Sequence, residues 1–576
     1  MKIVVVGGVA AGMSAAARAR RLSEAAEIVV IERTQHVSFA NCGLPYHIGG
    51  DIPEREALLL QTPQSLAESL NLDVRIGHEV TAIDRDHKNI LVTELNTGRT
   101  YTENWERLVL CPGASPVRPP IPGINHPRIH TLRNIEDMDA ILATLSQGVE
   151  SAVVIGGGYI GVEMAENLRH RQLRVDLVEM LDQIMPPFDP EMARDLQYHL
   201  EFHGVTLHLG TAASEFDDSD GRPCVKLSNG HSLAADIVVM AIGVRADSQL
   251  AKQAGIEIGA RGGIRVDVHQ RTSDPNIYAA GDAVEVIDTV TGAPTLVPLA
   301  GPANRQGRVV ADHIFGRDSS YRSTQGTAIV KIFEMTGGGT GSNEKTLQRI
   351  GKPYKKIYLH PSGHASYYPG TAPMQMKILF TPDTGQLLGA QVVGYDGVDK
   401  RIDVLATALR AKMTVFDLEE FELAYAPPYG SAKDPINMAG FIAANLLRGD
   451  VDFWYAETYP HDLPEGTLVD VRGEHEFSAW HIPDAINIPL GQLRTRMREI
   501  PADKPVYLYC RVGFRSYLAH RILVQSGFTQ VKTLAGGSKT FCSFHRTPLC
   551  TGRPGLPFVA HAEEQLARTV APNCAA

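Results

Sequence analysis

The chain lacks several features that would assign it to common protein classes. It has no run of about 18 apolar residues, so the sequence offers no candidate for a membrane-spanning helix. Its 7 cysteines are scattered over 576 residues, which argues against a disulfide framework and predicts a reducing compartment, the cytoplasm. The formal net charge of −10 is small for this length and argues against a nucleic-acid-binding protein. So long a chain exceeds a single hydrophobic core and predicts roughly three to four domains.

Residues 2–35 read as strand, glycine turn, helix and strand. The turn spans Gly7 to Gly12, and the second strand ends in Glu32. Glycines allow a dinucleotide's pyrophosphate to approach a helix N-terminus, and an acid about 20 residues later holds the ribose hydroxyls. The pattern predicts a dinucleotide-binding unit, although Val9 stands where the middle glycine of the fingerprint is expected.

Residues 151–179 repeat this pattern in its full form. An apolar strand precedes Gly156, Gly158 and Gly161, and the next strand ends in Glu179. A carboxylate at this position accepts a free ribose 2′-hydroxyl and repels a 2′-phosphate, so we expect NADH rather than NADPH. Two such units about 150 residues apart are more specific than either alone.

Three further segments occur with the two glycine loops in a fixed order along the chain. They are residues 108–123, residues 236–247 and residues 272–284, where a strand runs into Gly281 and Asp282. Together with the two glycine loops, they resemble the flavoprotein disulfide reductases with two dinucleotide-binding domains. The resemblance implies that the first unit binds FAD and the second NAD(P)H. It also implies that Asp282 contacts the ribityl chain of the flavin.

The C-terminal part carries a second resemblance. Within 466–545 the motifs D-V-R, H-I-P-x-A-x-N-I-P, C-R-x-G-x-R-S and G-G occur in this order, as in a rhodanese domain. The predicted fold is therefore α/β, with two Rossmann-like domains, an α+β dimerisation domain and a C-terminal α/β rhodanese domain. The predicted boundaries are 1–110 and 245–320 for the FAD-binding domain, 111–244 for the NAD(P)H-binding domain, 321–447 for the dimerisation domain, 448–465 for a linker, 466–560 for the rhodanese domain and 561–576 for a tail.

Cys42 is the candidate catalytic residue of the flavoprotein part. It follows the first dinucleotide-binding unit in H-V-S-F-A-N-C-G, and no second cysteine follows five residues later, so it must form its redox bond with a molecule that diffuses in. This pattern resembles the single-cysteine branch, namely coenzyme A disulfide reductases, coenzyme A persulfide reductases and NADH oxidases or peroxidases. A helix N-terminus and a flavin beside the thiol predict a lowered pKa for Cys42.

By the same resemblance, a second set of residues binds the 3′-phospho-ADP group of coenzyme A. Arginines suit phosphates because they form bidentate hydrogen bonds, although a solvated helix face would explain Arg18 and Arg21 equally well. The predicted set is Ser14, Arg18, Arg21, Ser38, Asn41, Arg305 and Lys433. Tyr367 and Tyr425 match the two tyrosines that coenzyme A reductases bring to the partner subunit's active site in a homodimer.

Cys510 is the candidate sulfur carrier of the rhodanese part. Backbone N–H groups of its loop form an anion nest, and Arg511 and Arg515 add positive charge, which would stabilise a thiolate or persulfide. The fusion favours reduction of persulfide or polysulfide to thiol and hydrogen sulfide, with Cys510 delivering sulfur and Cys42 reducing it. Coenzyme A disulfide reduction, NADH oxidation or peroxidation, and a sulfur-carrying redox sensor with a structural FAD remain alternatives; no metal is expected.

Overall fold

The structure is a computed structural model that describes residues 1–219, 221–461, 463 and 465–545. It divides into two compact units. Unit 1 contains Met1–Ile184 and His203–Gly326, and unit 2 contains Met185–Phe202 and the chain from Thr327 onward. Among the described residues, none of the helices combines the length and apolar composition that crossing a bilayer requires.

The first sheet of unit 1 is built from short β-branched runs that are buried on both faces, as parallel strands are. Its five strands run parallel in the order β18-β7-β1-β2-β3. They span Ile277–Ala279 (β18), Arg107–Leu110 (β7), Lys2–Val6 (β1), Glu27–Glu32 (β2) and Asp73–Ile76 (β3). The segments expected to form the first dinucleotide unit and the later strand before Gly281 thus meet in one sheet.

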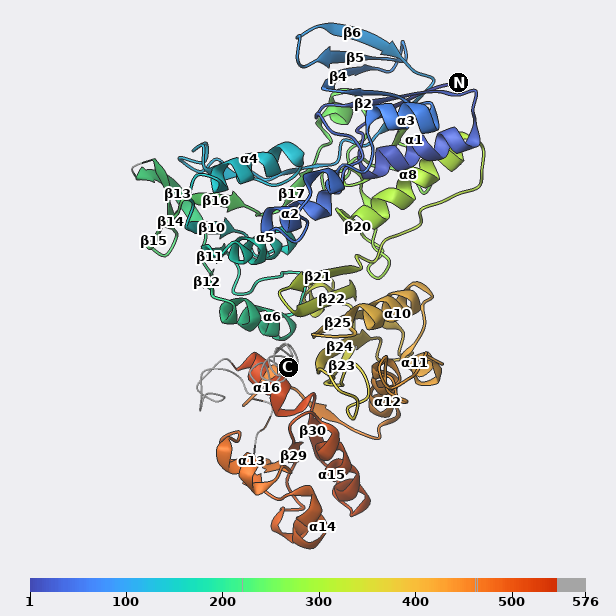
Figure 1. Ribbon diagram of the computed structural model, residues 1–576. Helices are drawn as coiled ribbons and strands as arrows, with labels where there is room; N and C mark the ends of the chain where they lie inside the picture. Colours follow the sequence, from blue (N-terminus) through green and yellow to red (C-terminus); the bar gives the residue numbers. More distant parts are fainter. Residues whose placement is uncertain (220, 462, 464, 546–576) are drawn as a thin grey trace, which may run out of the picture. The chain divides into compact units, whose positions relative to one another are not determined.

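Helices α1 (Ala10–Leu22) and α8 (Ala300–Ile314) lie side by side against this sheet (Figure 1). Their contact is close because α8 carries Gly307. A Cβ atom there would lie 2.2 Å from the carbonyl oxygen of Ala11, so no larger residue fits without moving a helix. The approach brings residues 300–306 of α8 near the glycine turn that precedes α1.

The second sheet of unit 1 repeats the architecture of the first. Its order is β12-β11-β10-β16-β9, all parallel. The strands span Val205–Leu209 (β12), Arg174–Glu179 (β11), Ser151–Ile155 (β10), Ile237–Met240 (β16) and Ile129–His130 (β9). Helix α5 (Tyr159–His170) follows β10 as α1 follows β1, so the predicted pair of Rossmann-like domains is confirmed.

Unit 2 begins with a five-stranded antiparallel sheet in the order β21-β22-β25-β24-β23. The strands span Ala328–Ile332 (β21), Met335–Gly341 (β22), Leu387–Gly394 (β25), Met374–Phe380 (β24) and Lys355–Leu359 (β23). Helix α10 (Val398–Arg410) packs against β22 and β25, and α12 (Pro435–Arg448) packs against α11 (Val415–Glu420). This is the α+β domain that the sequence predicts between the flavoprotein and rhodanese parts.

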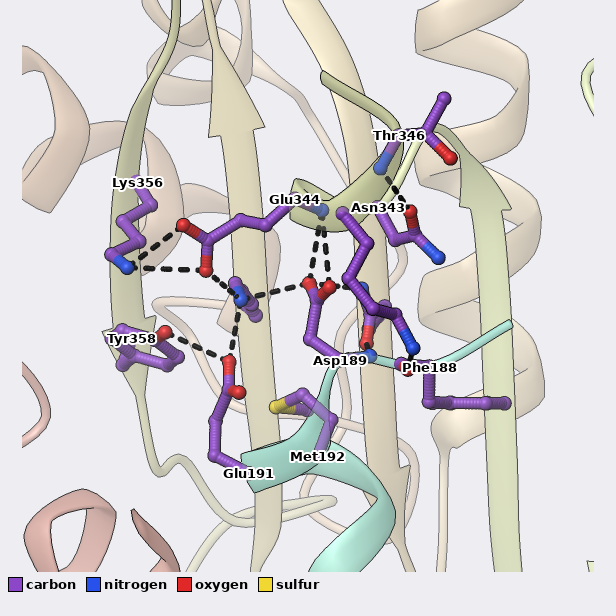
Figure 2. Close-up of polar contacts among 12 residues, drawn as sticks. Phe188, Asp189, Glu191, Met192, Asn343, Glu344, Thr346, Lys356 and Tyr358 are labelled. Carbon is purple, nitrogen blue, oxygen red and sulfur yellow. Dashed lines mark hydrogen bonds and ion pairs between the residues drawn. The ribbon is translucent and has the colours of Figure 1, made fainter. Parts of the chain in front are cut away.

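Helix α6 (Pro190–Phe202) belongs to unit 2, although the sequence places it inside the predicted NAD(P)H-binding range. A buried ion network explains this grouping. Lys377 of β24 is fully buried, and its Nζ lies 2.8 Å from Asp189 Oδ2 and 2.5 Å from Glu191 Oε1, with Glu344 as a third partner. Figure 2 shows these carboxylates converging beside Tyr358, whose hydroxyl donates to Glu191.

The same network reaches the C-terminal part of unit 2. Lys356 pairs with Glu344 at 2.8 Å and also with Glu457, which lies in a 3-10 turn (Ala456–Thr458) ahead of the last sheet. The Tyr455 hydroxyl donates to the Lys356 carbonyl oxygen at 3.1 Å. Charged groups far apart in the sequence therefore fix the start of the C-terminal part to β23.

The C-terminal part is a five-stranded parallel sheet in the order β26-β30-β29-β27-β28. The strands span Phe453–Trp454 (β26), Val531–Leu534 (β30), Val506–Tyr509 (β29), Thr467–Asp470 (β27) and Ile486–Asn487 (β28). Strand β26 lies in the segment predicted as a linker and forms one edge of this sheet. The predicted tail, 561–576, lies outside the described residues, as do positions 546–560.

Candidate functional site

The first glycine loop connects β1 to α1 at the carboxyl end of the parallel sheet. Gly7 has φ +99°, and a Cβ atom there would lie 2.1 Å from the Cys111 carbonyl oxygen, so this position requires glycine. The Gly8 N–H donates to Glu32 Oε2 at 2.7 Å, which holds this buried carboxylate against the loop. Gly12 lies inside α1, since the helix begins at Ala10, two residues before the predicted end of the turn.

The second glycine loop has the same construction. Gly156 has φ +108°, and the Gly157 N–H donates to Glu179 Oε2 at 2.6 Å. A Cβ atom on Gly161 would lie 1.8 Å from the Gly156 carbonyl oxygen, whereas one on Gly158 would meet no atom within 4 Å. The loop therefore packs tightly on its inner side and leaves space at Gly158, as a backbone that accepts a pyrophosphate must.

Asp282 follows β18 at the same sheet edge as the first glycine loop. The Gly281 N–H donates to Gln306 Oε1 of α8 at 2.7 Å, and Gly281 has φ +86°, so the turn that carries Asp282 is fixed. Burial raises the pKa of Asp282, and the charge of Arg133 opposes this effect. The arrangement places a half-buried carboxyl group beside the loop that the first dinucleotide would occupy.

Cys42 lies in a 3-10 turn (Asn41–Gly43) that continues directly into α2 (Leu44–Gly49). The turn is anchored on both sides: Ser38 N–H donates to the Gly8 carbonyl oxygen at 2.8 Å, and Ala40 N–H donates to the Leu58 carbonyl oxygen at 2.9 Å. Ser38 adopts φ +50°, which turns the chain sharply out of the sheet. Cys42 is exposed, so its thiol is open to a molecule from solution.

The protein groups around Cys42 act against the lowered pKa that the sequence predicts. Desolvation by surrounding protein raises the pKa of Cys42, and the charges of Glu163 and Asp282 raise it further. Helix α2 has only 6 residues, so its dipole supplies little compensation. Burial raises the pKa of Cys111 to about 12, which makes that thiol a poor nucleophile beside the exposed Cys42.

The residues expected to bind coenzyme A lie on several elements of unit 1. Ser14 Oγ on α1 donates to Asn304 Oδ1 on α8 at 2.5 Å, and Arg18 is paired with Asp312 on α8 at 2.7 Å. The ion pair with Asp312 orients the Arg18 side chain and neutralises part of its charge. The exposed members of the set in this unit are Arg21, Asn41 and Arg305.

Three residues predicted to act at Cys42 or to bind coenzyme A, namely Tyr367, Tyr425 and Lys433, belong to unit 2. The hydroxyls of Tyr367 and Tyr425 lie 3.0 Å apart, and both side chains are exposed, Tyr367 to 73%. Two large aromatic side chains joined at their polar ends and open to solvent are typical of a surface that meets a partner. Lys433 is also exposed.

Cys510 follows β29 and is buried, and its loop runs into α15 (Phe514–Gln525). The Gly513 N–H donates to Cys510 Sγ at 3.2 Å, and the Ser516 hydroxyl lies 3.6 Å from the same sulfur. The Gly513 N–H stabilises negative charge on the sulfur, while the single Ser516 hydroxyl proton is shared between this sulfur and the Gly513 carbonyl oxygen at 2.9 Å. One backbone N–H of the loop, that of Gly513, thus points at the sulfur, and Ser516 was not among the predicted residues.

The two arginines of this loop differ. Arg511 is exposed, but Arg515 forms a bidentate pair with Glu476 of α13 (Glu474–Ala479), at 2.6 and 2.8 Å. Its hydrogen bond to Arg515 lowers the pKa of Glu476 to about 2, so the pair is fully ionised at neutral pH. Arg511 is therefore the exposed arginine of this loop, whereas the charge of Arg515 is compensated by Glu476. Asp470 and Arg472 form a buried ion pair at 2.6 Å.

Sequence reasoning missed Glu163 and Tyr46. Helix α2, which carries Tyr46, packs against α5, which carries Glu163, and the charge of Glu163 raises the pKa of Cys42. Glu163 lies two residues after Gly161 of the second fingerprint, so its position in the motif was visible. Its proximity to Cys42 was not, because it depends on how α2 packs against α5.

Comparisons with known proteins agree with this architecture. The pyridine nucleotide-disulphide oxidoreductase family matches residues 1–301, its dimerisation domain matches 327–434, and the rhodanese-like domain matches 456–543. Among curated proteins, a coenzyme A disulfide reductase of Staphylococcus aureus (strain JH9) is 35% identical over 444 residues, which cover 77% of this chain and 99% of that protein. A protein of the same name from Staphylococcus epidermidis is 34% identical over 446 residues, with the same two shares.

Two solved structures span nearly the whole chain. Reduced Bacillus anthracis CoADR-RHD has a TM-score of 0.93 and 47% identity, and the match covers 95% of this chain and 98% of that one. A NAD-dependent persulfide reductase from A. fulgidus has a TM-score of 0.89 and 37% identity, and the match covers 94% of this chain and 100% of that one. The chain belongs to the pyridine nucleotide-disulphide oxidoreductase family, an oxidoreductase family that uses FAD and a nicotinamide dinucleotide, and it carries a C-terminal rhodanese-like domain.

Proposed function

We propose that the protein uses NADH and FAD to reduce sulfane sulfur, carried as coenzyme A persulfide or polysulfide, to thiol and hydrogen sulfide. The observation that carries this proposal is the exposed, unpaired Cys42 beside the first glycine loop, in a chain that also holds Cys510 in a sulfur-binding loop. Relatives named for coenzyme A disulfide and for persulfide support the same substrate classes.

The two glycine loops divide the cofactors between them. Gly7, Gly12, Glu32 and Asp282 would hold FAD, and the second loop, with Gly156, Gly158, Gly161 and Glu179, would hold NADH. The buried Glu32 and Glu179, each fixed by a loop N–H, fit ribose hydroxyls as acceptors. When bound, these cofactors supply the two electrons of the reaction.

Cys42 performs the sulfur chemistry. Its thiolate attacks the sulfur–sulfur bond of a persulfide R–S–S–H, so that R–S⁻ leaves and Cys42–S–S–H forms. Two electrons and one proton then cleave this bond, which gives hydrogen sulfide and restores the Cys42 thiolate. An exposed thiol suits this role because the substrate must reach it from solution.

Charged and polar residues of α1, α8 and positions 38–41 would position the thiol carrier. Arg21 and Arg305 are exposed and suit a phosphate, while Arg18, Ser14, Ser38 and Asn41 would orient the rest of a coenzyme A molecule. In a homodimer, Lys433, Tyr367 and Tyr425 would come from the partner subunit. The tyrosine hydroxyls would then donate hydrogen bonds to the departing thiolate.

Cys510 would deliver sulfur as a persulfide. The Gly513 N–H and the Ser516 hydroxyl stabilise the anionic sulfur, and Arg511 attracts an anionic donor. The carried sulfur would pass to coenzyme A or another thiol, which becomes the substrate of Cys42.

The second candidate is NADH-dependent reduction of coenzyme A disulfide, favoured by the name of the curated relatives. NADH oxidation or peroxidation is a weaker alternative. Peroxidase members of the single-cysteine branch that this sequence resembles carry a histidine in the first glycine loop, whereas this chain has Val9, Ala10 and Ala11 there.

Steady-state NADH oxidation with coenzyme A persulfide, polysulfide, coenzyme A disulfide and peroxide separates these candidates. We expect the highest kcat/KM with persulfide, and loss of turnover with every sulfur substrate in Cys42→Ser. Cys510→Ser should lose activity with polysulfide only. Full persulfide turnover in Cys42→Ser would refute the proposal, and loss of every activity in Cys510→Ser would make the rhodanese part the catalytic centre.

A further inference from the structure

The segment 421–434 joins α11 to α12 and forms neither a helix nor a strand. It carries Tyr425 and Lys433, which the proposed function brings from the partner subunit to Cys42. The Asn437 side chain on α12 donates to the Phe421 carbonyl oxygen at 2.9 Å, which fixes the start of the segment. A segment without regular structure keeps one conformation only where its backbone groups are bound, so its remaining contacts decide where the Tyr425 side chain points.

Lys400 on α10 binds the segment on both sides of Tyr425. Its ammonium group donates to the carbonyl oxygens of Ala424 at 3.4 Å and Tyr429 at 3.3 Å. The backbone also closes a turn there, since the Tyr429 N–H donates to the Ala426 carbonyl oxygen at 2.9 Å. Hydrogen bonds from a charged donor are stronger than those from a neutral one, so this cation holds the turn that follows Tyr425.

Arg401, the next residue of α10, binds the end of the same segment. Its guanidinium group pairs with Asp434 at 2.8 Å (Nη2 to Oδ2) and 3.4 Å (Nε to Oδ1), and both side chains are buried. Asp434 also accepts from the Ile436 N–H at 3.0 Å and so caps α12. Lys400 Nζ lies 3.7 Å from this carboxylate, which draws the ammonium group toward the segment. Two neighbouring cations of one helix therefore bind the segment at two places.

The segment that carries Tyr367 joins the same contacts. The Ala365 N–H donates to the Gly430 carbonyl oxygen at 2.9 Å, one residue after a carbonyl group that Lys400 binds. A Cβ atom on Gly430 would lie 3.6 Å from Lys400 Nζ, so this glycine lies close to the ammonium group. The 3.0 Å contact between the hydroxyls of Tyr367 and Tyr425 therefore depends on the packing around Lys400.

We propose that Lys400 is a positioning residue that orients Tyr425, so that the Tyr425 hydroxyl donates a hydrogen bond to the thiolate that departs in the step at Cys42. The inference rests on the proposed function and deepens it, because it names the residue that fixes this donor. In that step Cys42 bonds to the outer sulfur of the persulfide, the sulfur–sulfur bond breaks, and its electron pair stays on the departing thiolate. Tyr425 keeps its proton, and Lys400 touches no reacting atom. A fixed donor stabilises this anion more than mobile water does.

The two cations differ in what their removal would do to the fold. The Lys400 side chain is 32% exposed, and an ion pair at such a position adds little to stability. Arg401 is 1% exposed, and its loss would leave the buried Asp434 carboxylate without its bidentate partner. A substitution of Lys400 therefore tests the position of Tyr425 with little effect on the stability of unit 2.

The test is the single-turnover release of coenzyme A from coenzyme A persulfide, measured by rapid quenching in the full-length, FAD-containing enzyme with reduced Cys42. The parent for all variants is Cys510→Ser, in which the rhodanese loop cannot accept the sulfur. Lys400→Met should lower the limiting rate constant about tenfold, as expected for one lost hydrogen bond to an anion. The half-saturating substrate concentration should stay within about twofold, because Arg21 and Arg305, proposed to bind the phosphates, belong to unit 1.

Combined variants show whether Lys400 acts through Tyr425. Tyr425→Phe should lower the same rate constant about tenfold, and the double variant Lys400→Met/Tyr425→Phe should be no slower than Tyr425→Phe alone. Lys400→Arg keeps a cation that can donate to both carbonyl oxygens, so it should retain at least about half of the parent rate constant. Lys412→Met, the same substitution at an exposed position of unit 2, should match the parent.

Four results would overturn the inference alone. They are a parent-like rate constant in Lys400→Met, a loss seen only as a higher half-saturating concentration, losses that multiply to about a hundredfold in the double variant, and a Lys400→Arg enzyme as slow as Lys400→Met. A Tyr425→Phe enzyme as fast as the parent would overturn the inference together with the tyrosine part of the proposed function. Continued persulfide turnover in Cys42→Ser would instead overturn the proposed function itself, so these failures are distinguishable.

Discussion

Replacing Lys377 with methionine removes a cation that three buried carboxylates share, while leaving a side chain of similar length. Lys377 is fully buried and contacts Asp189, Glu191 and Glu344. Breaking a buried ion network by removing one partner costs about 3–5 kcal/mol, since the remaining charges lose their compensation. We therefore expect Lys377→Met to lower the free energy of unfolding of unit 2 by about that amount.

The pKa of Glu344 gives a second value for the free energy with which the same network stabilises the fold. Desolvation alone would raise this pKa, but the charges of Lys377 and Lys356 outweigh it and lower the pKa from 4.5 to about 2. At about 1.4 kcal/mol per unit, the shift corresponds to about 3 kcal/mol. Because the folded-state pKa is the lower one, this stabilisation is fully present above pH 4.5 and is lost as the pH falls toward 2.

Differential scanning calorimetry of the FAD-containing enzyme measures the effect. A loss of about 3–5 kcal/mol predicts a Tm lower by about 6–20 °C for the transition of unit 2. Lys412→Met, at an exposed position of the same unit, is the matched control and should leave Tm nearly unchanged. A Tm for Lys377→Met within about 2 °C of the control would refute the reasoning that this network holds α6 to the sheet.

Three further substitutions test the nucleotide loops and the rhodanese loop. Gly156→Ala places a Cβ atom 2.4 Å from the Ala241 carbonyl oxygen at φ +108°, so NADH binding measured by fluorescence titration should weaken at least about tenfold; unchanged affinity would contradict the loop geometry. Glu179→Ala removes the carboxylate proposed to accept the ribose hydroxyls, so the ratio of kcat/KM for NADH to that for NADPH should fall about tenfold, and an unchanged ratio would exclude Glu179 as the selecting group. Ser516→Ala removes a donor 3.6 Å from Cys510 Sγ, so sulfur transfer from thiosulfate to cyanide should slow about tenfold, whereas wild-type rates would leave the Gly513 N–H as the sufficient donor.

The sequence predicted those sites whose functional residues lie close together in the chain. Both dinucleotide loops could be located from the spacing of their glycines, the apolar strands before them and the glutamate that ends the next strand. The glycines are diagnostic because the backbone geometry at positions such as Gly7 and Gly156 tolerates no other residue. The same holds for the Cys510 loop, where the donors to sulfur come from the next six residues. Motifs of this kind are readable since the residues that cooperate are adjacent in the chain.

What the sequence did not predict depends on packing between distant segments. Arg515 was expected to add positive charge beside the Cys510 sulfur, but Glu476, 39 residues earlier, forms an ion pair with it. Helix α6 was assigned to the NAD(P)H-binding range, but the burial of Lys377 ties Glu191 at its start to a strand 186 residues later. Contacts across such separations leave no local pattern, so they become visible only in the folded chain.

Mass spectrometry of intact protein tests the central claim about Cys42 most directly. The enzyme with its FAD oxidised and its cysteines reduced, when exposed to coenzyme A persulfide or disulfide, should gain a sulfur or coenzyme A adduct that peptide mapping assigns to Cys42. Stoichiometric NADH should then remove it with release of hydrogen sulfide or coenzyme A. An adduct that forms only on Cys510, or one on Cys42 that NADH leaves in place, would contradict the claim.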